Sequence, residues 1–184
     1  MFIVHAIALM LGVLALSAPG ASADLVLPAG LVKASEPSLA PTTTFLDENG
    51  VPKTIESFRG KIVVLNFWAT WCPPCVKEIP SLERLATRLP TASFAVVGIS
   101  QDKGGMAVAK AFLLQHGAIK FPLYVDPKGQ LYRDLGIRGL PTTIVIGKDG
   151  VVDSTFEGPA EWDKAEFITY FLSLSQSTTK ALPE

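Results

Sequence analysis

Two cysteines and a glutamate in the segment WATWCPPCVKE, residues 68–78, form the residue set best suited to chemistry. Cys72 and Cys75 are the only cysteines in the chain, and only Pro73 and Pro74 separate them. A C-x-x-C pair beside alternating strands and helices is typical of thiol–disulfide redox chemistry. The pair therefore predicts a dithiol that cycles with a disulfide.

Less reactive interpretations of the two cysteines are weaker. A structural zinc site needs four ligands, and the only other candidates are His116 and His5, which lies in a segment expected to be removed. A structural disulfide suits an exported protein, but a four-residue loop contributes only about 2 kcal/mol. Two buried inert thiols would be unusual in an oxidising compartment. The residue types thus favour a redox pair and no metal site.

The position of Cys72 predicts how its thiol is activated. Cys72 follows an apolar strand and precedes a helix, and Pro74 fits the first helical turn. The positive end of the helix dipole lowers the pKa of a thiol placed there. Neither Pro73 nor Pro74 has a backbone N–H, so Cys75 is the nearest donor in the loop. This limited activation suits a reductant better than a strong oxidant.

Glu78 lies on the apolar face of the predicted helix. At 100° per residue one face carries a single stripe, formed by Cys75, Glu78, Leu82, Leu85 and Leu89. Burial beside Cys75 would raise the pKa of the Glu78 carboxyl group and equip it to exchange a proton with that thiol. The alternative is a surface glutamate that complements the helix dipole. Pro80 is expected to kink this helix.

Strands and helices alternate along most of the chain, which predicts an α/β fold. Apolar or alternating runs predict strands at 43–46, 62–68, 94–99, 123–125, 142–146 and 151–157. Helical periodicity covers 74–89, 106–116 and 160–174. Asp149-Gly150 marks a hairpin between the last two strands. The prediction is a parallel core with an antiparallel hairpin at one side.

The N-terminus resembles a secretory signal peptide. Residues 1–23 contain no Asp, Glu, Lys or Arg, an apolar core spans 6–16, and Ala21-Ser22-Ala23 forms an A-x-A site. Cleavage after Ala23 is expected, with an uncleaved membrane anchor as the alternative. Residues 24–40 are then an extended linker, 41–176 the folded domain and 177–184 a tail. The domain is expected to be exported to the periplasm.

The overall charge argues against nucleic acid as a partner. The chain of 184 residues has 16 Lys and Arg against 17 Asp and Glu, a formal net charge of −1. Nucleic-acid binding relies on a basic surface, which this balance does not supply. The length allows one domain with a sizeable core.

Several motifs together resemble the thioredoxin superfamily, more narrowly the exported TlpA/ResA/CcmG-like thiol–disulfide oxidoreductases. The resemblance covers about residues 41–174. It rests on Gly60-Lys61, the segment Asn66–Cys75, Glu78, Pro80 and the segment Gly136–Thr142. It implies a thioredoxin-like fold: a central mixed sheet flanked by helices, an extra N-terminal strand region, and a central insertion formed by helix 106–116 and strand 123–125.

The resemblance also implies residue roles. Cys72 attacks a substrate disulfide, and Cys75, assisted by Glu78, resolves the mixed disulfide. Trp71, Pro73, Pro74, Leu140 and Pro141 would bind substrate, with the Pro141 peptide bond cis and the ring facing the cysteines. Trp68 would pack beneath the loop, and Asn66 stands where cytosolic-type thioredoxins have a buried Asp.

Substrates and partners follow from the same resemblance. Family members take electrons from a membrane thiol carrier, need no cofactor, and reduce apocytochrome c or the cysteines of copper-site assembly proteins. A monomer is expected. A disulfide-introducing oxidase remains the nearest alternative, because the same atoms run in either direction. A copper metallochaperone on this scaffold is another alternative, and a peroxiredoxin is disfavoured because Ala69 replaces the Thr or Ser of its motif.

Overall fold

The computed structural model describes residues 26–176. The predicted signal peptide with its cleavage site, and the predicted tail, lie outside these residues. Within them, no helix is long and apolar enough to cross a membrane.

An eight-stranded mixed sheet forms the centre of the domain, in the order β1-β8-β7-β4-β5-β6-β2-β3. The strands are β1 (Leu31–Lys33), β2 (Phe45–Asp47), β3 (Pro52–Lys53), β4 (Ile62–Trp68), β5 (Phe94–Ser100), β6 (Leu123–Val125), β7 (Thr142–Ile146) and β8 (Val152–Glu157). Strands β4, β5 and β6 are parallel, whereas all other pairings are antiparallel. The predicted parallel core and the β7–β8 hairpin are confirmed.

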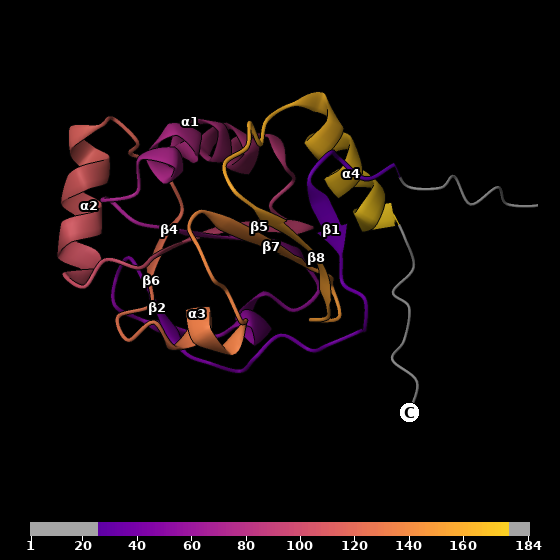
Figure 1. Cartoon of the computed structure of the whole chain (residues 1–184), viewed down its shortest axis with the longest axis horizontal. Coiled ribbons are helices and arrows are strands. Elements are labelled where there is room, and N and C mark those ends of the chain that lie inside the picture. Colours follow the sequence, from indigo (N-terminus) through magenta and orange to yellow (C-terminus); the bar gives the residue numbers. More distant parts are fainter. Residues whose placement is uncertain (1–25, 177–184) are drawn as a thin grey trace, which may run out of the picture.

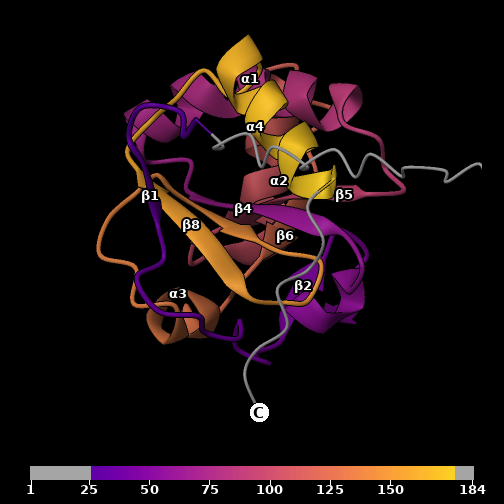
Figure 2. The same cartoon turned by 90° about the vertical axis from the view of Figure 1, so that its right-hand side faces the viewer.

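Helices cover both faces of the sheet. The helical segments are η1 (Ile55–Phe58), α1 (Pro73–Arg88), α2 (Gly105–Gln115), α3 (Gln130–Asp134) and α4 (Ala165–Gln176). In Figures 1 and 2, α1 and α4 lie on one side of the sheet and α3 lies on the other. This arrangement confirms the thioredoxin-like architecture, including α2 and β6 as the central insertion.

Strand β4 connects the two halves of the core because its side chains alternate between the faces. Ile62, Val64 and Trp68 join the cluster beneath α1, α2 and α4, while Val63 and Phe67 join the cluster beneath η1 and α3. All seven residues of the strand are buried. The same alternation places Asn66 on the α1 side of the sheet, which decides its role in the site.

The segment expected to be a linker, residues 24–40, contains a strand. Residues 31–33 form β1 and pair with β8, with Leu31 opposite Phe156. Leu31 is buried in the core, and Lys33 forms an ion pair with Asp153. Pairing with β8 holds this short strand, and Leu31 is its only buried side chain, which explains why no periodic pattern revealed it.

Two other predicted boundaries require correction, whereas helix α1 runs through Pro80 as one element, in agreement with the predicted span 74–89. The first strand begins at Phe45 and not at residue 43. Helix α4 begins at Ala165, five residues later than predicted, because the preceding backbone is bonded elsewhere: Ala160 N–H donates to Glu78 and Trp162 N–H donates to Ser81.

Candidate active site

The two cysteines form a disulfide at the start of α1. Their Cα atoms are 5.3 Å apart, and Cys72 is the N-cap residue of the helix, followed by Pro73 and Pro74. The backbone N–H of Cys75 donates to Cys72 Sγ over 3.3 Å. The sequence-based expectation that Cys75 provides the nearest backbone donor in this loop is confirmed.

The two cysteines differ in what they border. Both belong to the same buried core cluster, with Cys72 5% and Cys75 0% exposed, but Cys72 also lines an open groove of about 570 Å³. We call this hollow the active-site groove; residues 71–74 form one wall, residues 138–140 the other, and Gln101 and Tyr132 complete it. Trp71 is 66% exposed at its rim. A molecule in the groove can therefore reach Cys72 but not Cys75.

Pro141, the predicted cis proline, directly follows the wall formed by residues 138–140 and is not itself among the residues that line the groove. The Leu140–Pro141 peptide bond is cis, and Leu140 lines the groove with Cys72. The carbonyl of Pro141 accepts a hydrogen bond from Gly158 N–H at 2.9 Å. Thr142 Oγ1 donates to the carbonyl of Gly139, also at 2.9 Å. These bonds fix the wall to the β7–β8 hairpin.

Glu78 lies three residues after Cys75 on the buried face of α1, as the stripe predicted. The residue is only 2% exposed. Its Oε1 accepts a hydrogen bond from Asn66 Nδ2 at 2.7 Å, and its Oε2 accepts from Trp162 Nε1 at 2.9 Å and from Ala160 N–H at 3.0 Å. The alternative of an exposed glutamate that only complements the helix dipole does not match this environment.

Burial dominates the protonation behaviour of this carboxyl group. Loss of solvent raises the pKa of Glu78 from 4.5 to about 7. The hydrogen bonds from Trp162, Ala160 and Asn66 oppose that rise because they favour the charged form. A pKa near neutrality lets the group hold or release a proton under physiological conditions.

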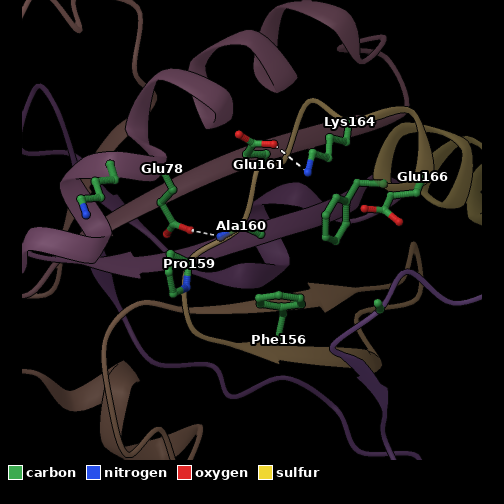
Figure 3. Close-up of a pocket in the computed structure, with 10 residues that line it drawn as sticks. Glu78, Phe156, Pro159, Ala160, Glu161, Lys164 and Glu166 are labelled. Carbon is green, nitrogen blue, oxygen red and sulfur yellow. Dashed lines mark hydrogen bonds and ion pairs between the residues drawn. The ribbon is translucent and has the colours of Figure 1, made fainter.

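A second cavity lies on the side of Glu78 nearer α4. It has a volume of about 420 Å³ and is lined by Glu78, Phe156 and Pro159, among others. Figure 3 shows Glu78 directed toward Ala160, with Lys164 and Glu161 paired nearby. The carboxyl group therefore lies at the wall of a cavity distinct from the active-site groove.

The predicted supporting residues Asn66 and Trp68 are both fully buried in β4. Asn66 Nδ2 also donates to Thr143 Oγ1 at 2.9 Å, so the amide joins α1 to β7. Trp68 packs edge-on against Phe121, with ring centroids 5.4 Å apart, and belongs to the same core cluster as both cysteines.

Trp162 is a partner of the site that sequence reasoning missed. It lies 84 positions from Glu78, in the turn before α4, yet its indole donates to that carboxyl group. The side chain is fully buried and packs against Phe156 and Phe167. Nothing in the local sequence marks it, because the contact depends on how α4 folds back over α1.

Asp102 is a second missed residue. It is 5% exposed, and its carboxylate accepts from Thr70 N–H at 3.1 Å, from Thr70 Oγ1 at 2.7 Å and from Ser100 Oγ at 2.8 Å. Thr70 precedes Cys72 by two positions, so these bonds attach the disulfide loop to the end of β5. A signal was available, since functional side chains gather at the carboxyl ends of parallel strands.

Metal-binding chemistry finds no support in residues 26–176. No group of three or more His, Cys, Asp or Glu side chains in that range could hold a metal ion. His116 stacks on Phe112 with ring centroids 4.0 Å apart at the end of α2.

Known proteins are similar to this chain in sequence and in fold. Residues 38–155 match the family described as AhpC/TSA family. Thiol-disulfide oxidoreductase ResA of Bacillus thuringiensis subsp. konkukian is 34% identical over 127 residues, 69% of this chain and 72% of that protein. ResA of Bacillus subtilis is 32% identical over 130 residues, 71% of this chain and 72% of that protein.

Solved structures of thiol–disulfide exchange proteins have a similar fold. A putative thiol:disulfide interchange protein DsbE from Chlorobium tepidum superimposes with a TM-score of 0.67 at 29% identity, over 76% of this chain and 97% of that chain. StoA from Bacillus subtilis superimposes with a TM-score of 0.59 at 27% identity, over 72% of this chain and 98% of that chain. With a C-x-x-C disulfide at the start of a helix on a thioredoxin-like sheet, this chain belongs to the AhpC/TSA family and is one of its thiol–disulfide oxidoreductases.

Proposed function

We propose that the protein reduces disulfides in exported substrate proteins through the Cys72–Cys75 dithiol. The observation that carries the proposal is the unequal placement of the two sulfurs. Cys72 lines the active-site groove, whereas Cys75 is buried on the helix face that also carries Glu78. Such a pair suits an attacking thiol followed by a resolving thiol.

The first step is attack on the substrate. The Cys72 thiolate displaces one sulfur of the substrate disulfide, forming a bond between Cys72 Sγ and the other substrate sulfur. The released substrate thiolate takes a proton from solvent. The N-terminus of α1 stabilises the Cys72 thiolate, but Pro73 and Pro74 supply no N–H, which keeps the activation moderate.

The second step is resolution. The Cys75 thiol transfers its proton to the Glu78 carboxylate and attacks Cys72 Sγ, which breaks the mixed disulfide and releases the second substrate sulfur as a thiolate. The protein ends as the Cys72–Cys75 disulfide, having given two electrons to the substrate. Glu78, with its pKa of about 7, exchanges that proton near neutral pH.

A dithiol carrier must then return two electrons to the disulfide, and a membrane thiol donor is the proposed source. Apocytochrome c or copper-site assembly proteins are the proposed substrates. The predicted signal peptide of residues 1–23 supports a periplasmic location. The protein is proposed to act as a monomer.

The reduction potential tests the direction of electron flow. The purified domain is equilibrated with mixtures of reduced and oxidised glutathione, and the fraction of dithiol is read by thiol alkylation and mass spectrometry. A reductant is expected to have a potential below about −200 mV, the range of thioredoxin and glutaredoxins. A value near −120 mV, typical of a strong oxidant, would instead favour the disulfide-introducing alternative.

A further inference from the structure

The active-site groove contains one cation. Arg138 lines it together with Cys72 and Leu140. The other residues of the lining are aromatic, apolar or uncharged: Trp71, Tyr132, Gln101, Gly139 and the two prolines. Arg138 therefore places one positive charge at the edge of the groove through which a substrate segment must approach Cys72.

This guanidinium is weakly engaged by the protein itself. Its ion pair with Glu157 has a separation of 3.6 Å, too long for a hydrogen bond, and the two side chains are 85% and 67% exposed. Exposed pairs of this kind contribute little and are screened by salt. By contrast, the nearby Arg133 donates to the Lys128 carbonyl at 2.9 Å and to Gln130 Oε1 at 2.8 Å.

Charge complementarity at an otherwise neutral groove implies a preference among substrates. Arginine binds carboxylates through two parallel N–H donors, which gives direction as well as attraction. Trp71, Leu140 and the ring of Tyr132 offer apolar surface on either side. A segment that combines an apolar residue with an acid fits this lining better than a basic one.

We infer that the groove selects peptide segments that carry Asp or Glu within about three residues of the disulfide cysteine, with Arg138 as the specificity-determining residue. This inference rests on the proposed function. Arg138 and Cys72 line the same groove, and about three residues of an extended substrate chain cover about 10 Å of it. Glu157 competes with the substrate acid for the same guanidinium.

The experiment uses three peptides with one intramolecular disulfide and blocked termini. They differ only in the residue two positions from one cysteine: Glu, Gln or Lys. The pre-reduced protein is mixed with each, and the second-order rate constant of disulfide reduction is measured by quenched-flow mass spectrometry at low and high salt. Blocked termini exclude recognition of a terminal carboxylate.

For the wild-type protein the Glu peptide is expected to react about three- to tenfold faster than the Gln peptide, and the Lys peptide more slowly, with both differences shrinking at high salt. Arg138→Gln should remove the preference, and Arg138→Glu should reverse it. Glu157→Gln should widen it by removing the competing carboxylate. Arg133→Gln, the matched control outside the groove lining, should leave it unchanged.

Two failures are distinguishable. If all three peptides are reduced at the same rate, or if Arg138→Gln keeps the preference, the inference is overturned while the reductase activity stands. If none of the peptides is reduced although the dithiol is fully formed, the proposed function itself fails. Thermal melting of the exposed Arg138 variants confirms that each is folded, so a lost preference is attributable to the missing charge.

Discussion

The two sides of the disulfide differ in what surrounds them. On the Cys72 side lies an open groove with an exposed tryptophan and an almost uncharged lining. On the side of Cys75 and Glu78 lies a buried polar cluster, in which every donor to Glu78 comes from a buried or partly buried residue. One side is open to contact with another molecule, whereas the other holds a carboxyl group whose pKa is raised by burial.

The first two turns of α1 place the two cysteines in different surroundings. The N-cap position gives Cys72 contact with solvent and with the helix dipole. The next turn carries Cys75 and Glu78 into the core, where loss of water and fixed donors determine the carboxyl pKa. Variants of each side should therefore fail in different ways.

The largest difference is expected between the two cysteines. Cys72→Ser should abolish reduction of insulin, because the attacking thiolate is gone. Cys75→Ser should instead accumulate mixed disulfides with substrate, because nothing resolves them. An insulin-reduction assay measures the first outcome, and non-reducing gels detect the mixed disulfides. Adducts on the Cys72 variant and none on the Cys75 variant would reverse the assignment.

Glu78→Gln sharpens the comparison by changing only the buried side. The first attack by Cys72 should keep its rate, whereas resolution by Cys75 should slow by about 10²-fold, the lower range for a lost proton-transfer group. Stopped-flow measurement of the two phases separates these steps. Glu161→Gln, at the rim of the neighbouring cavity, is the matched control and should change neither phase.

Glu78 should also make stability depend on pH. Its pKa is about 7 in the folded protein and 4.5 when unperturbed, so the folded state binds the extra proton between these values. The contribution of Glu78 to stability is then fully present below about pH 4.5 and is lost as pH rises through 7, by up to about 3 kcal/mol. Urea unfolding of wild type against Glu78→Gln should show this slope only in the wild type. A parallel slope in both proteins would assign it to other groups.

A smaller effect is expected when the hydrogen bonds between Asp102 and the disulfide loop are removed. Asp102→Ala leaves Thr70 N–H and two hydroxyl groups without their acceptor, at a cost of about 1–3 kcal/mol. It should also shift the thiol pKa of Cys72, measured by alkylation rate against pH. Asp126→Ala removes an equally buried carboxylate that accepts from Gln130 and Tyr132 N–H. This control should cost similar stability without shifting that pKa.

The sequence predicted the parts of the fold whose signal is local. Strand β4 was predicted with its observed bounds because seven consecutive residues are buried, and Glu78 was placed correctly because helical spacing fixes its face. Strands β1 and β3 and helix α3 were missed because two to five residues carry no period. The partners Trp162 and Asp102 were missed because folding brings them to the site from distant positions.

The two edge strands of the sheet determine how readily other chains can add to it. The outermost strands are β1, with three residues, and β3, with two. Lys33 terminates the first, and the second consists of Pro52, which has no N–H to offer, and Lys53. Short edges with charge and proline are poor templates for strand addition by another chain. The domain can therefore expose its groove to unfolded substrates without recruiting them, or its own copies, into aggregates through its sheet.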